Sequence, residues 1–346
     1  TTTPELTVRD LATLPKAHLH VHLEGAMRPA TLAELAAAAG VPVPPVRGFA
    51  SFAEFVRMYD GARLLVRTRE QLARVVREVV QDAAADGAVW VEVQATPVPY
   101  APALGSPEEV LALLLEAGRA EAERLGIGFG LMAVALRHEP PSAAEDLARL
   151  AAGHAGRGVV SFGLAADESL FPPAPFERAF AIAREAGLVS TPHAGELLGP
   201  QSVRDALDRL GARRVQHGVR AVEDPALVAR LAAEGVVLDV CPTSNVELAV
   251  VPEIGRHPLP ALLEAGVRCS INGDDPLLFG PGLLEEYETA RLALALSDEQ
   301  LAGCARASLE GAAAPSSEAR AGQALTTSPS SAGEARPSCR GSTRTV

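Results

Sequence analysis

Three histidines stand at alternate positions near the start of the chain, at His18, His20 and His22. A β-strand sends every second side chain to the same face, so these imidazoles would lie side by side. Neutral imidazole is the usual nitrogen ligand of zinc, and a pair at a strand end makes half of a metal site. We interpret His20 and His22 as ligands. We expect His18, deeper along the strand, to be structural, together with the isolated His138, His154 and His257.

Further groups with metal-binding or acid–base chemistry follow much later in the chain. His193 begins the run His-Ala-Gly-Glu that ends at Glu196, His217 stands in Gln-His-Gly-Val, and Asp274 and Asp275 stand in Asn-Gly-Asp-Asp-Pro. Three imidazoles and one carboxylate suit a divalent ion such as zinc, with water completing the coordination. The sequence therefore predicts one Zn²⁺ per chain, bound by His20, His22, His193 and Asp274.

The other three groups of this set are predicted to act as catalysts. Glu196 follows a ligand by three positions, and a carboxyl group that keeps its proton there would serve as general acid. His217 would orient or deprotonate the attacking water, and Asp275 would accept hydrogen bonds from that water or from a substrate ring. Each also has a plainer interpretation: Glu196 as a helix N-terminal carboxylate, His217 as a buried polar contact, and Asp275 as a turn residue.

Eight short apolar runs alternate with longer amphipathic segments, such as residues 68–86 and 106–125. Several of these segments end in glycine just before the next run, as helices commonly do. This alternation predicts a single-domain parallel (β/α)8 TIM barrel, in which catalytic groups lie at the carboxyl ends of strands. The histidines and aspartates of the set follow this rule. The predicted strands are residues 17–21, 89–94, 128–136, 159–164, 188–192, 214–216, 236–240 and 267–271.

Two segments lie outside this repeat. Residues 51–66 form a predicted helical insert after the first strand, in which Phe52 and Phe55 share one face; they would either cover a substrate as a lid or pack on the barrel. We predict that the barrel occupies residues 1–310. Residues 311–346 are rich in Ser, Thr, Ala, Gly, Pro and Arg and nearly lack large apolar side chains, which predicts a disordered tail.

Composition bounds the partners of the protein. A formal net charge of −12 argues against a nucleic-acid backbone or an anionic membrane surface as the partner. The sequence has no apolar stretch long enough to span a bilayer and no signal-peptide pattern. Its four cysteines form no Cys-x-x-Cys pair, which fits a reducing compartment. We therefore expect a cytoplasmic protein that acts on a small molecule.

The motifs together resemble the adenosine deaminase family of the amidohydrolase superfamily, and the resemblance extends from Leu14 to about Leu309. It implies a TIM-barrel enzyme that hydrolyses the 6-amino group of a small-molecule 6-aminopurine nucleoside and releases ammonia. The motifs that carry the resemblance are Pro-Lys-Ala-His-Leu-His-Val-His-Leu-Glu-Gly at 15–25, Thr-Pro-His-Ala-Gly-Glu at 191–196, Gln-His-Gly-Val at 216–219, Cys-Pro-Thr-Ser-Asn at 241–245 and Ser-Ile-Asn-Gly-Asp-Asp-Pro at 270–276.

The resemblance also implies roles for single residues. It places the zinc ion on the same four ligands that the spacing predicts. By this resemblance Glu196 protonates the purine N1, His217 activates or steers the attacking hydroxide, and Asp275 bonds that hydroxide and the purine N7. The backbone N–H at Ala166 would bond the purine N3, although the family usually has glycine there.

The chain departs from the usual adenosine pattern on the side of the pocket that would hold the ribose. Glu24 stands where many adenosine deaminases have an aspartate that contacts the ribose 5′-hydroxyl, and Gln94 stands where an arginine is usual. The segments around Met27 and Phe279 look more like actinobacterial relatives, some of which deaminate aminodeoxyfutalosine in menaquinone biosynthesis. The predicted substrate is therefore adenosine or a 5′-modified adenosine, with aminodeoxyfutalosine and free adenine as alternatives.

Two hypotheses come from other functional classes. A binuclear amidohydrolase usually needs a lysine on the fourth strand to bridge two metals, but the only lysine here is Lys16, before the first strand. A non-catalytic nucleoside-binding protein would be expected to have lost a ligand or the proton donor. Because the sequence has all of these residues, the deaminase remains the favoured prediction.

Overall fold

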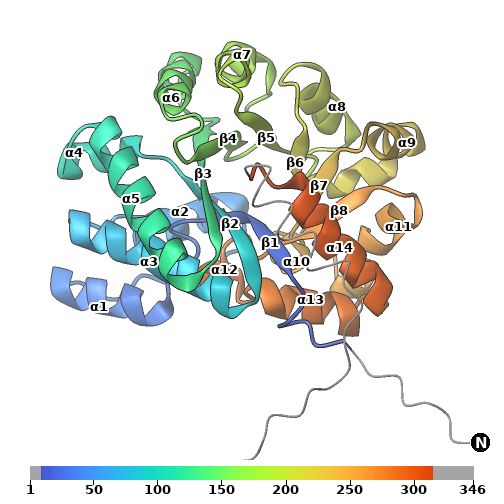
Figure 1. Cartoon of the computed structure of the whole chain (residues 1–346), viewed down its shortest axis with the longest axis horizontal. Helices are drawn as coiled ribbons and strands as arrows, with labels where there is room; N and C mark the ends of the chain where they lie inside the picture. Colours follow the sequence, from blue (N-terminus) through green and yellow to red (C-terminus); the bar gives the residue numbers. More distant parts are fainter. Residues whose placement is uncertain (1–8, 315–346) are drawn as a thin grey trace, which may run out of the picture.

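The computed structural model describes residues 9–314, whose centre is a sheet of eight parallel strands (Figure 1). The strands are hydrogen-bonded to one another in sequence order, from the first to the eighth. They are β1 (Lys16–His22), β2 (Ala88–Ala95), β3 (Gly128–Leu136), β4 (Val159–Ala165), β5 (Val189–Ala194), β6 (Arg214–His217), β7 (Val237–Val240) and β8 (Arg268–Ile271).

The circle closes through the residues that follow β8. The N–H of His22 donates to the carbonyl of Asp274 at 3.0 Å, and the N–H of Asp274 donates to the carbonyl of His20 at 3.0 Å. Closure leaves no free sheet edge at this end of the barrel. It also brings Asp274, a candidate metal ligand, against the candidate ligands His20 and His22 of β1. The predicted (β/α)8 barrel is confirmed, and the ends of each predicted strand fall within two residues of those observed.

Helices surround the strands, and several of them begin and end at the residues that the sequence marks. Thr68 and Ser106 form capping boxes at the starts of α3 and α5, and Gly126 ends α5 in the left-handed conformation. The helices are α1 (Pro29–Ala39), α2 (Phe52–Arg63), α3 (Arg69–Ala85), α4 (Ala101–Leu104), α5 (Pro107–Leu125), α6 (Pro141–Gly153), α7 (Glu177–Glu185), α8 (Pro200–Asp208), α9 (Pro225–Glu234), α10 (Pro242–Glu247), α11 (Leu259–Glu264), α12 (Pro276–Phe279), α13 (Leu283–Leu292) and α14 (Asp298–Gly311), with short 3₁₀ turns η1 (Val98–Tyr100), η2 (Ala174–Phe176), η3 (Val219–Glu223) and η4 (Ile254–Arg256).

The main apolar core lies between the strands and the surrounding helices. Phe162 of β4 and Phe180 of α7 are fully buried and meet edge to face, with ring centroids 5.0 Å apart. Removing such side chains from water contributes roughly 2–3 kcal/mol each to folding. This shell holds the strands in place, so that their carboxyl ends can carry polar side chains.

The amino-terminal end of the barrel is closed by a buried charge cluster and by the chain after α14. Arg214 lies 2.6 Å from Glu92 and 2.6 Å from Asp239, and all three are buried. The N–H of Ala313 donates to Glu92, and Arg214 donates to the carbonyl of Gly311. Residues 311–314 of the predicted tail are therefore packed against the barrel, and the rest of that prediction, residues 315–346, lies outside the described residues.

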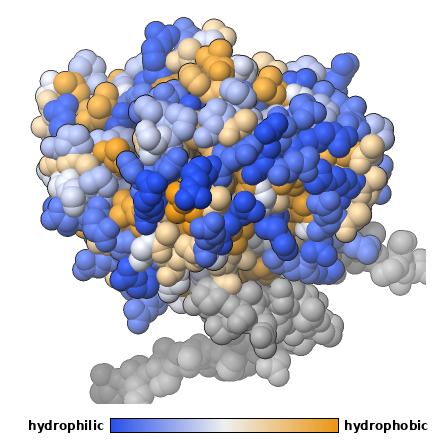
Figure 2. Space-filling model, turned by 90° about the horizontal axis from the view of Figure 1, so that it is seen from above, coloured by the Kyte–Doolittle hydropathy of each residue, from blue (hydrophilic) through white to orange (hydrophobic). Residues whose placement is uncertain are grey.

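The face of the molecule seen in Figure 2 is largely polar. Figure 2 shows hydrophilic residues over most of the face in view, with apolar residues scattered between them. Within residues 9–314, no helix is both long enough and apolar enough to cross a bilayer.

Candidate active site

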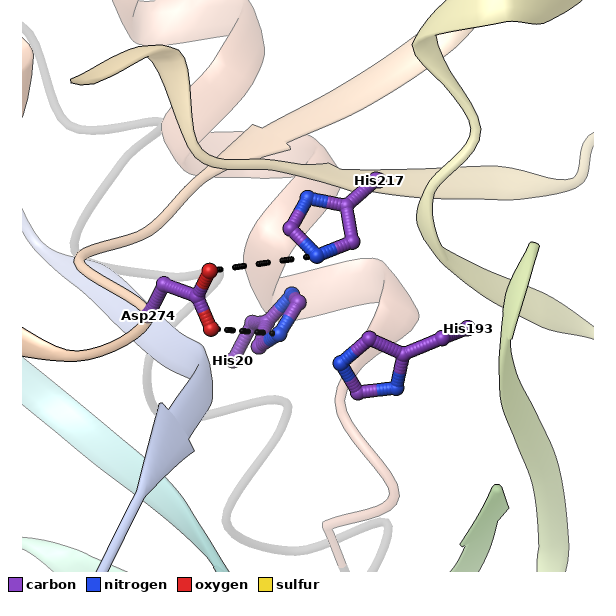
Figure 3. A group of neighbouring side chains, drawn as sticks. All are labelled: His20, His193, His217 and Asp274. Carbon is purple, nitrogen blue, oxygen red and sulfur yellow. Dashed lines mark ion pairs between the residues drawn. The ribbon is translucent and has the colours of Figure 1, made fainter. Parts of the chain in front are cut away.

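The four predicted ligands lie together at the carboxyl end of the barrel. Asp274 Oδ1 is 3.1 Å from His20 Nε2 and 3.3 Å from His22 Nε2, which are two positions apart on β1. His193, at the end of β5, has its ring centroid 4.8 Å from that of His20. Figure 3 shows His20, His193, His217 and Asp274 gathered about a common centre. Strand alternation and barrel closure therefore bring these donors together.

The contacts behind two of the histidines test whether this set fits a metal. His20 Nδ1 lies 3.3 Å from the carbonyl oxygen of Asp239, and His193 Nδ1 lies 3.1 Å from that of Leu164. A carbonyl oxygen only accepts, so each ring has its proton on Nδ1 and a lone pair on the inward-facing Nε2. His20 Nε2 is buried without a hydrogen-bond partner among the described residues.

The electrostatics of this centre also favour a cation. Ser244 donates to Asp274 Oδ2 at 2.6 Å, which leaves the other carboxylate oxygen facing the imidazoles. Burial opposes protonation of His22, yet the neighbouring Asp275 and Asp274 carboxylates raise its pKa to about 9. The donors, their tautomers and the local negative charge fit a divalent ion such as zinc.

The predicted proton donor lies beside this centre. Burial and the nearby Asp274 carboxylate raise the pKa of Glu196 well above its ordinary range, which favours the neutral acid. Glu196 Oε1 is 3.4 Å from His217 Nε2, and His217 Nε2 is 3.8 Å from Asp274 Oδ2. A buried acid that keeps its proton at this position can supply it to a bound molecule.

Two residues hold the end of β5, which carries His193, and the loop after it, which carries Glu196. Arg137, which is buried at the end of β3, donates to the carbonyl of His193 at 2.6 Å. Glu168 accepts from the N–H of Gly195 at 3.1 Å. Neither residue has a role predicted from the sequence, because nothing local in the sequence shows that either side chain holds a distant segment in place.

Asp275 lines the cavity and is packed against the turn after β1. Its Oδ1 is buried without a hydrogen-bond partner among the described residues. A Cβ atom added at Gly25 would lie 1.6 Å from this oxygen, so only glycine leaves room for the carboxylate. Gly25 therefore allows the Asp275 carboxylate to lie against this turn at the wall of the cavity.

One cavity of about 380 Å³ lies at the carboxyl end of the barrel, and of the groups described above it is lined by His22, His193, Glu196, His217, Asp274 and Asp275. The predicted insert is the helix α2, whose side chains form part of the cavity wall. Phe55 of α2 stacks on Phe279 of α12, with ring centroids 5.3 Å apart and an interplanar angle of 13°. The predicted substrate-binding residues Phe52, Phe55, Glu24, Ala166 and Asp275 all line this cavity.

Glu24 is fixed in place by two tyrosines that sequence reasoning did not connect with it. The Tyr59 hydroxyl of α2 donates to Glu24 Oε2 at 2.5 Å, and the Tyr100 hydroxyl of η1 donates to Oε1 at 2.6 Å. Glu24 itself is 4% exposed. The only local signal was the position of Tyr59 on the same helical face as Phe52 and Phe55.

Gln94 is the second polar group on this side of the cavity. It pairs in register with His22 across β1 and β2, and it is 1% exposed. Neither its Oε1 nor its Nε2 has a hydrogen-bond partner among the described residues. Leaving a buried amide unpaired costs roughly 1–3 kcal/mol, so this side chain calls for a polar ligand.

Comparison with known proteins places the chain among purine deaminases. The family model described as adenosine deaminase matches residues 15–322. A putative adenosine/adenine deaminase of Streptomyces virginiae is 46% identical over 321 residues, which cover 89% of this chain and 94% of that protein. An adenine deaminase of Sinorhizobium medicae is 40% identical over 307 residues, with coverage of 87% and 94%.

Two solved structures of this class of enzyme are also similar to this chain. The adenine deaminase of Arthrobacter aurescens superposes with a TM-score of 0.84 at 31% identity, covering 90% of this chain and 98% of that one. An amidohydrolase of Burkholderia ambifaria with bound zinc superposes with a TM-score of 0.82 at 27% identity, covering 93% of this chain and 94% of that one.

Proposed function

The chain belongs to the adenosine deaminase family and is a deaminase of the amidohydrolase type; from this premise we propose that it hydrolyses the 6-amino group of adenine. The observation that carries the proposal is that the four predicted metal donors meet a buried neutral acid, Glu196, at one cavity. Such a pairing supplies both a nucleophile and a proton, which are the two requirements of hydrolytic deamination.

We assign zinc to the set of His20, His22, His193 and Asp274. The zinc bound in the B. ambifaria structure supports this choice, as does the lone pair that His20 and His193 direct inward. When bound, the ion supplies Lewis-acid chemistry and lowers the pKa of a water molecule toward neutrality.

The remaining residues of the site act on the purine. Glu196 gives its proton to N1, which draws electron density away from C6 and makes that carbon a better electrophile. His217 and Asp275 hold the water oxygen that adds to C6. The amino nitrogen takes up one proton of the water, the bond between C6 and that nitrogen breaks, and ammonia leaves. The oxygen on C6 gives its remaining proton back to Glu196, and the 6-oxopurine remains. The backbone N–H of Ala166 would hold N3 and so fix the ring in the plane of these groups.

The polar wall made by Glu24 and Gln94 supports the free base as the substrate. Glu24 is one methylene longer than the aspartate of many adenosine deaminases, and its two tyrosine partners hold it against the cavity. The unpaired amide of Gln94 faces the same space. A free base offers an imidazole-ring N–H to these acceptors, whereas N9 of a nucleoside has no hydrogen to give. Relatives described as adenine deaminases agree with this choice.

The test is an ultraviolet assay on metal-loaded protein that compares kcat/KM for adenine, adenosine, 5′-methylthioadenosine and aminodeoxyfutalosine. We expect adenine to be preferred by at least about 100-fold, because a site that pairs with a substrate N–H strongly rejects analogues that lack it. Glu24→Asp should narrow this preference, while Glu253→Asp, at a side chain that is 66% exposed, should not.

Two results would change the conclusion. A higher kcat/KM for adenosine or a 5′-extended adenosine would return the substrate to the nucleosides that the sequence predicts. Metal-loaded protein that deaminates none of the four compounds would contradict the proposed activity itself.

A further inference from the structure

A chain of hydrogen bonds runs behind His217, on the side away from the cavity. The backbone N–H of Leu259 donates to His257 Nδ1 at 3.1 Å, and His257 Nε2 lies 3.1 Å from Asn245 Oδ1. Asn245 Nδ2 then lies 3.2 Å from His217 Nδ1. The three side chains are buried, with His257 the most exposed at 4%. These hydrogen bonds connect the start of α11 to the active site through Asn245 of α10.

The direction of each hydrogen bond in this series follows from the first one, between Leu259 and His257. A backbone N–H can only donate, so His257 Nδ1 is an acceptor and the neutral ring has its proton on Nε2. Burial lowers the pKa of His257 to about 4, which keeps the ring neutral. His257 Nε2–H therefore donates to the oxygen of Asn245, and the Asn245 amino group donates to His217 Nδ1. The remaining proton of a neutral His217 must then be on Nε2, facing the cavity.

The two imidazoles with carbonyl oxygens behind them have the opposite tautomer. Because His20 and His193 place Nδ1 against carbonyl acceptors, their protons are on Nδ1 and their Nε2 lone pairs face the centre. By distance alone His217 would belong with them, since one donor atom from each of His20, His193, His217 and Asp274 lies within 4.8 Å of the others. The group that contacts Nδ1 distinguishes them: a carbonyl acceptor at His20 and His193 leaves Nε2 free to bind a metal, whereas the Asn245 donor at His217 places a proton on Nε2.

We propose that Asn245 and His257 are positioning residues that hold His217 in its Nε2–H tautomer. In this form His217 cannot use Nε2 as a metal ligand, and it cannot take a proton there from water. It instead donates a hydrogen bond to the oxygen that adds to the purine, so that of the two roles predicted from the sequence it orients the water and does not deprotonate it. This last step rests on the proposed function, whereas the tautomer does not.

The test is ¹⁵N NMR of metal-loaded, full-length protein labelled at its histidine ring nitrogens, with the His217 signals assigned through His217→Asn. We expect a protonated Nε2 and an unprotonated Nδ1 for His217, and the reverse protonation at Nδ1 for His20 and His193. Asn245→Asp presents only acceptors and should move the His217 proton to Nδ1. With the tautomer reversed, kcat should fall about 10²–10⁴-fold while metal content stays unchanged.

Matched variants separate positioning from folding. His257→Gln keeps an N–H donor toward Asn245 and should retain the His217 tautomer and most of kcat. His257→Leu removes the donor, so the His217 proton should no longer be confined to Nε2 and kcat should fall. His154→Gln, at a histidine that pairs with Glu108 outside the cavity, should leave the His217 signals unchanged. A fall in kcat without a change in the His217 ring signals would show that the variant loses activity through a structural change and not through the tautomer.

The proposal would be overturned by a wild-type His217 with its proton on Nδ1, by a metal bound to its Nε2, or by an Asn245→Asp tautomer identical to that of the wild type. Because the ring signals are read without substrate, this outcome is independent of the activity assay. Protein that shows the expected tautomer but deaminates no purine would contradict the proposed function and leave the positioning assignment standing.

Discussion

Ala166, His217 and Asp274 face the cavity from the left-handed backbone region, with φ angles of 80°, 61° and 58°. This region costs residues other than glycine roughly 1–2 kcal/mol each. The surrounding bonds sustain the strain: Asp274 is tied into barrel closure through its backbone, and His217 is held by Asn245. Strain of this kind clusters at functional sites because it aims side chains that relaxed backbone would turn away.

Ala166→Gly should relieve one part of this strain. We expect the free energy of unfolding to rise by about 0.5 kcal/mol or more, since the relief exceeds the greater chain entropy of unfolded glycine. Ala165→Gly is the matched control, because Ala165 is not among the residues with positive φ and its replacement should destabilise. Urea denaturation measures both, and equal losses in the two variants would contradict the argument.

Glu196→Gln removes the predicted proton donor with little change of shape. We expect kcat to fall about 10²–10⁴-fold, the usual contribution of a positioned acid, with metal content unchanged. Steady-state kinetics and metal analysis on one sample measure this, with Glu247→Gln on the exposed surface as the control. Near-wild-type turnover by the metal-loaded variant would remove Glu196 from this role.

Sequence could predict the donors of the site because their spacing has a direct structural meaning. Alternate histidines on an apolar strand must share a face, as His20 and His22 do. It could not predict Arg137, Tyr100 or His257, because each acts through a partner that only the packed loops bring near. His257 was expected to be an isolated structural histidine for that reason.

Helix α2 and the turn η1 supply the hydroxyls that fix Glu24, so two elements outside the strands set one wall of the cavity. The strands themselves were predictable within two residues, because each apolar run is bounded by turn or helix-stop residues. The insert was predicted as a helix from one apolar face. Its contact with Glu24 was not, because the angle at which a helix crosses a barrel mouth depends on loops whose course the sequence does not encode locally.

Tyr59→Phe and Tyr100→Phe should each weaken binding on this wall. A hydrogen bond to a charged group contributes about 1.5–3 kcal/mol, so we expect kcat/KM for adenine to fall at least about 10-fold, mainly through KM. Tyr287→Phe is the matched control, since the Tyr287 hydroxyl is buried without a partner among the described residues. If all three variants behaved alike, the tyrosines would not act through Glu24.

The barrel carries the candidate active site at its carboxyl end and is closed at its amino-terminal end, and both ends contain buried charged groups. At the closed end Arg214 pairs with both Glu92 and Asp239, and the backbone carbonyl of the same Asp239 faces His20 Nδ1. Residues 311–314 complete this end. Composition predicted a disordered tail from residue 311 and did not indicate these contacts, because backbone groups, which are common to every residue type, make them.

Arg214→Met should destabilise the folded barrel strongly. It leaves two carboxylates buried without compensation, and breaking a buried pair in this way costs about 3–5 kcal/mol. Arg149→Met removes an ion-pairing arginine that is 55% exposed, and it should cost less than about 1 kcal/mol. Thermal and urea unfolding would measure the difference, and similar losses in both variants would contradict the role given to the buried cluster.

The most direct test of a single-metal purine deaminase is a zinc titration of metal-stripped, full-length protein, followed by the initial rate of adenine deamination. The rate should rise linearly and stop rising at one equivalent of zinc per chain, with His193→Ala protein showing no such break. A break at two equivalents would point to a binuclear centre. Protein that takes up zinc and deaminates no 6-aminopurine would contradict the central claim.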